Sequence, residues 1–384
     1  MSRSLLIDDI GLLVTHDPEH GERENAALAI EDGIVAAILD AGSGAAADAR
    51  LDAGGRCVIP GFVDSHTHLV FAGDRSDEFA ARMAGAPYVA GGINVTTDAT
   101  RAASTDELIA LAQARLAEAH RCGITHLEIK SGYGLDVESE RRICQAAGTL
   151  TDDVTFLGAH LVPREWAEDP DGYVDLVCGE MLEACAPLAR WIDVFCETGA
   201  FDAEQSRRVL QAGRTAGLGL RVHGNQLGFG DGVRLACELG AASVDHCTYL
   251  TEVDVDALAA GDTVATLLPA TDFSTRQPYP DARRLIDAGA QVAIATNTNP
   301  GSSYTQSMAF CLALAVRDMR MTVAEALAAA TLGGARALRR SDVGHLGIGA
   351  RGDAVVLDAP SPTHLVYRPG MDLVAHTVVQ GRVR

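Results

Sequence analysis

The chain has 384 residues, of which 47% are hydrophobic, and a formal net charge of -21 at pH 7. This length exceeds that of a typical single-core domain, so a large barrel or two packed units are expected. No apolar run reaches the roughly 18 to 20 residues of a membrane span. The acidic balance argues against nucleic acid, which proteins bind through clustered Lys and Arg. We therefore expect a soluble protein with neither a membrane partner nor a nucleic-acid partner.

The N-terminal segment and the cysteines both predict a cytoplasmic protein. Residues 1–14 carry acids inside an apolar stretch and lack the basic flank and cleavage site of a signal peptide. The nine cysteines are scattered singly, without a CxxC pair. They are expected to be reduced core residues and to form neither disulfides nor a thiolate zinc site.

The two ends of the chain share a β-like pattern. Residues 1–55 and 345–384 contain short apolar alternations separated by turn residues such as Asp32-Gly33. We interpret them as one small β-sandwich domain built from both termini, in addition to a barrel domain over 56–344.

Between these ends, eight short apolar runs alternate with longer helical patterns, which is typical of βα units and a parallel sheet. The runs cover 57–68, 124–130, 154–160, 191–197, 218–226, 242–249, 263–270 and 291–299. One intervening segment has Ser104 or Thr105 as a helix cap and Gly123 at its end. This α/β pattern predicts a TIM (β/α)8 barrel, whose functional groups lie at the carboxyl ends of the strands.

Polar side chains stand at those strand ends in seven of the eight runs, the exception being the run that ends near Pro269. The residues concerned are His66, His68, Lys130, His160, Glu197, His223, His246, Asn297 and Asn299. Lys130 is also the only lysine of the chain. Two interpretations of it stay open, an ion pair with Glu128 and a chemical role.

The sequence 64–68, Asp-Ser-His-Thr-His, predicts a metal site at the end of the first run. Residues two apart in a strand face the same side, so both imidazoles can reach one ion, and Asp64 can orient them. His223 supplies a third ligand and Asn297 a fourth position. Such ligands suit one divalent or ferric ion, zinc or iron. The ion would lower the pKa of a bound water from about 15.7 toward about 7 and so activate it for attack.

Four segments carry a more specific resemblance. They are PGFVDSHTHLVFAGDRSDEF (60–79), EIKSGYGLD (128–136), HGNQLG (223–228) and ATNTNPGSSYT (295–305). In order and spacing they resemble the imidazolonepropionase family of the amidohydrolases, over about residues 55–350. The strings AGDR, EIKSGYGL and NPGSS are not general to amidohydrolases, and they point to this one family.

The resemblance implies a role for each matching position. Metal ligands would be His66, His68 and His223. Contacts with the imidazolone propionate substrate are implied for Arg75, Tyr133, His160, Gln226 and Ser302, and contacts with the ring-opened product for Asn299 and Gly301.

Residue chemistry agrees with several of these roles. Arg75 can hold a propionate with two hydrogen bonds, although an arginine just past a strand is more often a surface ion-pair residue. Tyr133 and His160, taken alone, would as often be packed core groups. His246 is a catalytic candidate, as a proton carrier or an orienting residue, with a plain structural histidine as the rival interpretation.

One position departs from the family pattern. Where that pattern has ATDxNPG, this chain has Asn297 in ATNTNPG. An aspartate would both bind the metal and accept a proton from the attacking water, whereas an amide oxygen can coordinate but is not a comparable base. Three interpretations compete: a change made to trap a bound ligand, a natural variant with altered activity, and an inactive relative. We favour the first because the rest of the site is intact.

The predicted function is hydrolysis of 4-imidazolone-5-propanoate to N-formimidoyl-L-glutamate in histidine degradation, by metal-activated water and in a homodimer. Asn297 would reduce or abolish turnover. One alternative is another cyclic-amide hydrolase or a deaminase on the same barrel. A second alternative, which Asn297 makes plausible, is a non-catalytic ligand-binding relative.

Overall fold

The computed structural model describes residues 4–85 and 92–384. The chain divides into two compact units. The first, called the terminal unit, consists of Met1–Ser65, Ala117–His126 and Gln306–Arg384. The second, called the central unit, consists of His66–Leu116 and Leu127–Thr305.

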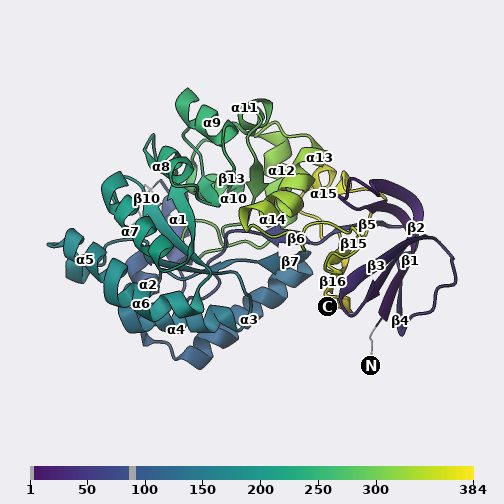
Figure 1. Ribbon diagram of the computed structural model, residues 1–384, viewed down its shortest axis with the longest axis horizontal. Coiled ribbons are helices and arrows are strands. Elements are labelled where there is room, and N and C mark those ends of the chain that lie inside the picture. The colour runs from purple at the N-terminus through teal and green to yellow at the C-terminus, as the bar shows by residue number, and fades with distance from the viewer. Residues whose placement is uncertain (1–3, 86–91) are drawn as a thin grey trace. The chain divides into compact units, whose positions relative to one another are not determined.

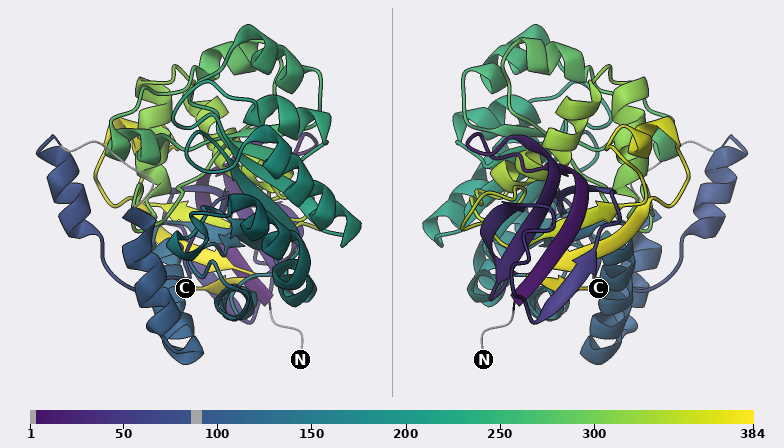
Figure 2. Two further views of the ribbon diagram at one scale, coloured as in Figure 1. Left: turned by 90° about the vertical axis from the view of Figure 1, so that its left-hand side faces the viewer. Right: turned by 90° about the vertical axis from the view of Figure 1, so that its right-hand side faces the viewer.

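The terminal unit contains an eight-stranded sheet with strands from both ends of the chain, in the order β17-β16-β15-β5-β1-β2-β3, with β4 paired to β1. The strands are β1 (Ser4–Val14), β2 (Glu22–Glu31), β3 (Ile34–Asp40), β4 (Ala49–Asp52), β5 (Cys57–Pro60), β15 (Ala354–Leu357), β16 (Val374–Val379) and β17 (Arg382–Val383). Figure 2 (right) shows the purple N-terminal strands beside the yellow C-terminal ones. The predicted small β domain from both termini is confirmed, and its strands form one connected sheet. Of the N-terminal segment, residues 1–3 lie outside the described residues.

Local sequence explains this sheet. Asp32 and Gly33 adopt φ of 50° and 83°, the left-handed conformation that a two-residue hairpin turn between β2 and β3 requires. Alternate residues of the strands face one apolar core, where Ile7, Leu28 and Val356 are completely buried. The domain boundaries at 55 and 345 stay a prediction.

Outside the eight-stranded sheet, the terminal unit contains a further strand, β6 (Phe62–Asp64), and helices. The run 57–68 is not one strand, because β5 pairs within the sheet and β6 pairs with β7 (Ile124–Leu127). Gly61 separates them, and a Cβ atom there would collide with the side chain of Thr125. Only glycine allows this close approach. The helices of this unit are α12 (Met308–Arg317), α13 (Val323–Ala328), α14 (Gly334–Ala337) and α15 (His364–Tyr367).

The central unit is built on a seven-stranded sheet whose strands follow one another in chain order from β8 to β14, with parallel pairing throughout. The strands are β8 (Ile129–Lys130), β9 (Val154–Ala159), β10 (Trp191–Cys196), β11 (Gly219–Gly224), β12 (Ser243–His246), β13 (Val264–Leu267) and β14 (Val292–Ile294). Parallel register brings their carboxyl ends to one edge.

Residues 66–68 close this sheet by bonding to both of its outer edges. The amide of Lys130 at the end of β8 donates to the carbonyl oxygen of Thr67 at 2.8 Å. On the other side, the amide of His68 donates to the carbonyl oxygen of Thr298, beyond β14, also at 2.8 Å. A parallel sheet closed in this way is a barrel, so the predicted TIM-type fold is confirmed.

Helices cover the outside of the strands (Figure 1). Those of the central unit are α1 (Ser76–Met83), α2 (Ile93–Ala102), α4 (Val137–Gly148), α5 (Pro170–Leu176), α6 (Leu182–Cys185), α7 (Ala203–Thr215), α8 (Gly232–Glu238), α9 (Glu252–Ala259), α10 (Pro269–Thr275) and α11 (Ala282–Asp287). α10 begins directly after β13, which explains why the seventh run lacks a polar end. In the described part of the chain, no helix has the length and apolar character needed to cross a bilayer.

The predicted helix over 104–123 is α3 (Thr105–Arg121). Ser104 caps it, because its hydroxyl oxygen accepts from the amide of Glu107 at 3.2 Å while the Glu107 carboxylate accepts from the amide of Ser104 at 3.0 Å. This reciprocal pair is a capping box. Gly123 follows the helix with a φ of 82°, as expected for a left-handed position after a helix end.

Candidate active site

Four histidines, two of which follow β6 and the others of which lie at the ends of β11 and β12, gather at the carboxyl ends of the strands of the central unit. The ring centroid of His66 lies 5.3 Å from that of His68 and 4.5 Å from that of His223. The rings of His223 and His246 are 5.5 Å apart. All four side chains are almost fully buried. Barrel closure therefore brings together histidines that lie up to 180 residues apart in the chain.

One group of residues that could hold a metal ion consists of His66, His223 and His246, which offer nitrogen atoms that all lie within 4.8 Å of one another. It shares two of the three predicted ligands. His68, the third, has its ring 5.8 Å from that of His223. It stacks on His160, with centroids 5.5 Å apart and an interplanar angle of 19°.

Two buried carboxylates orient two of these rings. His66 Nδ1 donates to Asp245 Oδ2 at 2.7 Å, and His223 Nδ1 donates to Asp193 Oδ1 at 3.1 Å. A proton on Nδ1 leaves the lone pair of Nε2 available for an ion. The sequence analysis missed both aspartates. The available signal was an acidic residue inside an apolar strand run, where a charge is expensive unless it is paired.

The histidines fit a metal ion. His66 Nε2, His68 Nδ1 and His246 Nδ1 are buried and have no hydrogen-bond partner among the described residues. Burial lowers the pKa of all three imidazoles well below 6.5, and nearby positive groups lower it further. Neutral imidazoles with free lone pairs are the ligands that zinc and iron take from histidine.

Asn297 lies beside this group in a strained conformation. Its φ is 52°, a left-handed value that asparagine tolerates better than most residues, and its amide N–H donates to the carbonyl oxygen of His66 at 3.0 Å. The side-chain Nδ2 donates to Thr271 Oγ1 at 2.9 Å, and Oδ1 accepts from Asn299 Nδ2 at 3.2 Å. The sequence analysis also missed Thr271, which accepts the hydrogen bond from the Asn297 side chain.

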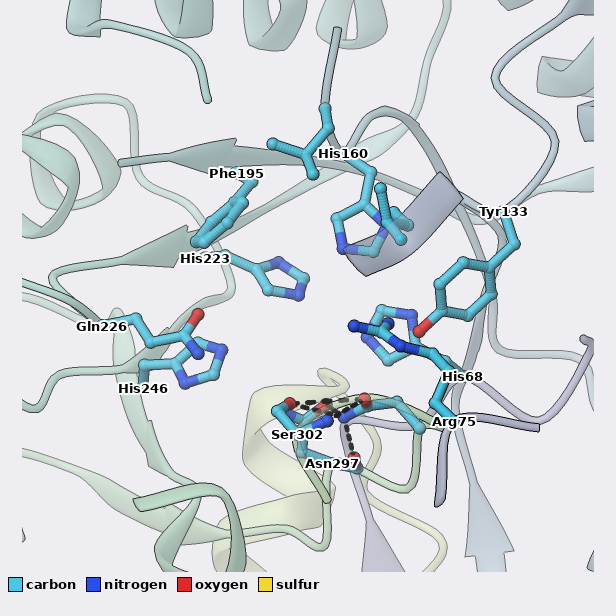
Figure 3. A pocket seen from close by; sticks show the side chains of 13 residues that line it. His68, Arg75, Tyr133, His160, Phe195, His223, Gln226, His246, Asn297 and Ser302 are labelled. Carbon is cyan, nitrogen blue, oxygen red and sulfur yellow. Dashed lines mark hydrogen bonds between the residues drawn. The ribbon is translucent and has the colours of Figure 1, made fainter. Parts of the chain in front are cut away.

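A cavity opens above the histidines. Figure 3 shows side chains from several strand ends pointing into one central space. The cavity is lined by His68, Arg75, Ile93, Tyr133, His160, Leu161, Phe195, His223, Gln226, His246, Asn297, Asn299 and Ser302. All predicted substrate-contacting residues are therefore in its wall, and of the two product-contacting residues Asn299 is as well. Ile93, Leu161 and Phe195 add an apolar part that sequence reasoning did not find.

Arg75 lines the cavity and is also an ion-pair residue. Its Nε and Nη2 donate to the two carboxylate oxygens of Glu78 at 2.7 and 2.8 Å. Its Nη1 lies next to Gly301, where an added Cβ atom would collide with the guanidinium group. The carbonyl oxygen of Gly301 accepts from Arg82 at 2.9 Å. Gly301 is therefore adjacent to the cavity and is packed between two arginines of the α1 region.

Tyr133 stands in a short loop that Glu140 holds from behind. The carboxylate of Glu140 accepts from the backbone amides of Gly132, Gly134 and Leu135 at 2.9, 2.7 and 2.8 Å. Glu140 is completely buried, and nothing in the sequence pattern distinguished it from other helix acids. Its contacts fix the loop that carries Tyr133 into the cavity.

Residues 299–302 form a second rigid loop at the cavity wall. Asn299 Oδ1 accepts from the amides of Gly301 and Ser302, both at 2.8 Å, and its Nδ2 donates to Ser302 Oγ at 2.9 Å. The predicted residue Gln226 precedes Leu227, whose amide donates to the Glu197 carboxylate at 2.9 Å. The loop 299–302 and the loop that carries Gln226 are thus both held by hydrogen bonds from backbone amides to side chains, as loops at strand ends often are.

A closed βα barrel with histidines at its carboxyl edge defines a class of hydrolases, and the comparison with family models agrees. Residues 57–384 match the model of the Amidohydrolase family. Because the match covers most of the chain, the protein belongs to the amidohydrolase family.

Curated relatives narrow this assignment. The imidazolonepropionase of Salinispora tropica is 60% identical over 384 residues, which cover 98% of each chain. The imidazolonepropionase of Saccharopolyspora erythraea is 63% identical over 385 residues, covering 99% of this chain and 98% of its own length. Within its family the chain therefore belongs to the imidazolonepropionases, hydrolases that act on a cyclic amide. The predicted family is confirmed, and the deaminase and non-catalytic alternatives are not favoured.

Solved structures share the fold at low identity. The zinc complex of the atrazine chlorohydrolase TrzN of Arthrobacter aurescens is 18% identical with a TM-score of 0.72, covering 99% of this chain and 94% of its own. The guanine deaminase of C. acetobutylicum with bound guanine is 13% identical with a TM-score of 0.73, covering the whole of both chains. These likenesses support the barrel fold.

Proposed function

We propose that the protein hydrolyses 4-imidazolone-5-propanoate to N-formimidoyl-L-glutamate in histidine degradation. The oxygen of water joins the ring carbonyl carbon, the bond from that carbon to the ring nitrogen breaks, and the nitrogen takes up a proton. The observation that carries the proposal is the cluster of buried histidines at the base of a cavity whose wall includes Arg75. Relatives named imidazolonepropionase, about 60% identical over nearly the whole chain, support it.

We assign one zinc or iron ion to this cluster, held by His66, His68 and His223 with Asn297 as a fourth position. The zinc complex of the atrazine chlorohydrolase supports this class of ion. When bound, the ion would polarise the ring carbonyl and lower the pKa of a water molecule. The protein's own contribution is orientation, because Asp245 and Asp193 hold the rings of His66 and His223.

Arg75 is the proposed partner of the substrate propionate. Glu78 occupies its Nε and Nη2, so the substrate carboxylate would meet the edge of the guanidinium group beside Gly301. Glu78 thereby fixes the direction in which the cation faces. A charge-assisted bond of this kind contributes about 1.5 to 3 kcal/mol.

The ring of the substrate would lie between the polar groups of the cavity wall. Because His160 donates its Nδ1 proton to a backbone carbonyl, its Nε2 can accept an N–H bond from the ring. Tyr133 and Gln226 would bond the other polar atoms of the ring, and Ser302 would complete the contacts with the substrate. After ring opening, Asn299 and Gly301 would contact the product.

Proton transfer is the step that Asn297 weakens. We propose that position 297 and His246 manage the proton of the attacking water. His246 would act through its Nδ1, which has no hydrogen-bond partner among the described residues. An amide cannot accept this proton, so hydrolysis by this chain is expected to be slow.

Replacing Asn297 by aspartate tests the proposal. Asn297→Asp is expected to raise the rate of imidazolone loss, followed by absorbance, by about 10² to 10⁴-fold, the range typical of a positioned general base. Asn299→Asp adds a carboxylate two residues away and is expected not to raise the rate. Equal rates for the parent and Asn297→Asp would refute the role of position 297. Release of ammonia from the substrate would indicate deamination and overturn the proposed reaction.

We further propose a homodimer in the cytoplasm, without nucleic-acid or membrane partners, and domain boundaries near residues 55 and 345. Sedimentation equilibrium over a range of concentrations tests the dimer. A single species with the mass of one chain would refute it.

A further inference from the structure

A fully buried group of five charged side chains lies beneath the histidine cluster. We call it the buried charge cluster. It consists of Glu128, Lys130, Asp193, Arg221 and Asp245, each with a side-chain exposure of 0%. Two cations and three carboxylates give the cluster a formal charge of −1. This negative charge lies on the side of the histidines away from the cavity.

Lys130 stands at the centre of this cluster. Its Nζ lies 2.8 Å from Glu128 Oε1, 2.7 Å from Asp193 Oδ2 and 3.6 Å from Asp245 Oδ2. An ammonium group has three N–H donors and no acceptor, so it can serve three carboxylates on different strands at once. The predicted ion pair with Glu128 is confirmed, but it is one contact of three.

Two of these carboxylates also accept hydrogen bonds from the histidines. Asp193 bonds Lys130 through Oδ2 and His223 through Oδ1. Asp245 uses Oδ2 for both Lys130 and His66. One ammonium group therefore lies behind two aspartate–histidine pairs, one from β10 and β11 and the other from β12 and the segment after β6.

The third carboxylate reaches the segment that carries the histidine pair. Glu128 Oε2 accepts from the amide of Thr67 at 3.2 Å, and Thr67 Oγ1 donates to the carbonyl oxygen of Glu128 at 2.6 Å. Thr67 lies between His66 and His68 in the chain. The contacts of Lys130 thus reach every histidine that we assign to the metal.

Arg221 is the second cation of the cluster. Its Nη2 lies 3.2 Å from Asp245 Oδ2, and its Nε lies 3.8 Å from Glu128 Oε1. Asp193, which holds His223, has the ammonium group of Lys130 at 2.7 Å.

Stability alone does not account for such a cluster. Burying five charges incurs a large desolvation cost, and apolar side chains of similar volume often give equal or greater stability. Groups that orient metal ligands from behind, in contrast, typically change metal affinity about 10 to 100-fold when removed. We propose that Lys130 is a positioning residue that fixes the carboxylates behind His66 and His223 and so preorganises the metal site. This inference rests on the proposed metal site.

The test compares metal binding in Lys130→Met and the parent protein. Zn²⁺ affinity is measured by competition with a chromophoric chelator, and the visible spectrum of the Co²⁺-loaded proteins reports the ligand geometry. Lys130→Met is expected to bind Zn²⁺ about 10 to 100-fold more weakly and to have an altered Co²⁺ spectrum. Lys130→Arg keeps the charge and is expected to lose less affinity than Lys130→Met.

Arg340→Met is the matched control. Arg340 is a mostly buried cation of the terminal unit that bonds Asp342 with two hydrogen bonds of 2.7 Å. Its loss is expected to lower the melting temperature while leaving Zn²⁺ affinity and the Co²⁺ spectrum unchanged. This separates general destabilisation from loss of ligand positioning.

Three results would overturn the inference. If Lys130→Met binds Zn²⁺ as the parent does and only its melting temperature falls, Lys130 is structural and the metal site itself stands. If the parent binds no metal, the metal site and the inference both fail. Should Lys130→Met not fold, Lys130→Gln is measured in the same way, and parent-like Zn²⁺ affinity in that variant would likewise refute the inference.

Discussion

His160 donates its Nδ1 proton to the carbonyl oxygen of Gly132 at 2.9 Å. Burial and, to a smaller extent, the nearby His223 lower the pKa of His160 to about 3. The ring is therefore neutral at physiological pH, with a protonated Nδ1 and an accepting Nε2. A strand-end histidine is thus prepared as a hydrogen-bond acceptor for a ring N–H.

Replacing this acceptor should weaken substrate binding without a change in pH dependence. His160→Phe keeps a flat ring beside His68 but removes Nε2, and a neutral hydrogen bond is worth about 1 kcal/mol. We expect KM for the imidazolone to rise about fivefold, measured in the Asn297→Asp background, where turnover is fast. The ratio of KM values should be constant between pH 6 and 9. A ratio that changes across this range would show that His160 titrates there.

Glu140 should affect substrate binding through the loop of Tyr133. Glu140→Gln replaces an acceptor of three amide bonds by a group with one acceptor oxygen, so at least one amide loses its partner. We expect KM to rise about tenfold or more while kcat changes less and Zn²⁺ content is unchanged. Glu138→Gln is the control, because Glu138 is exposed on the same helix and pairs with Arg141. An equal effect of both variants would contradict the role of Glu140.

Asp272 should make the protein less stable as the pH rises. Burial raises the pKa of its carboxyl group to about 8. Its Oδ1 accepts from Thr248 at 3.0 Å, while Oδ2 has no hydrogen-bond partner in the described part of the chain. Between about pH 4 and 8 the folded state binds one proton more than the unfolded state, so the stability contributed by this group is lost as the pH rises.

Asp272→Asn removes this titration. Urea unfolding of the parent and the variant at several pH values between 6 and 8 is expected to show a difference that moves in favour of the variant, by up to about 1.4 kcal/mol per pH unit. The control is Asp262→Asn, at an exposed position before β13. A difference that stays constant with pH would mean that Asp272 is ionised throughout.

The single lysine allows burial to be tested directly. Lys130 has a side-chain exposure of 0%, and an amine-reactive reagent needs access to its Nζ. Under native conditions we expect mass spectrometry to find modification at the N-terminus only, and at Lys130 only after denaturation. Rapid native modification of Lys130 would contradict the closed cluster around it.

The barrel could be predicted because its signals are local. Apolar runs separated by amphipathic segments reflect strand and helix periods, which depend on neighbouring residues. The division of the run 57–68 at Gly61 could not be predicted in this way. It arises from the close approach of Thr125, a residue of a different strand.

Part of the candidate site could also be predicted from the sequence. The pair His66 and His68 is visible because strand residues two apart share a face. The ends of the other apolar runs also indicated His160, His223, His246, Asn297 and Asn299. The remaining residues came from resemblance to a family, and the cavity wall contains nearly all of the predicted residues. The aspartates behind the rings were not predicted, because the neighbouring sequence does not show which side chain an acidic residue in an apolar run will contact.

The sequence by itself determined the order of the βα units, the small β domain from both termini and the presence of a histidine pair at a strand end. These properties follow from periodicity and spacing, which act over a few residues. Tertiary structure alone decided that His66, His223 and His246 share one space and that Lys130 holds the carboxylates behind two of them. Such contacts depend on how the sheet closes, since closure sets the distances between strands that are far apart in the chain.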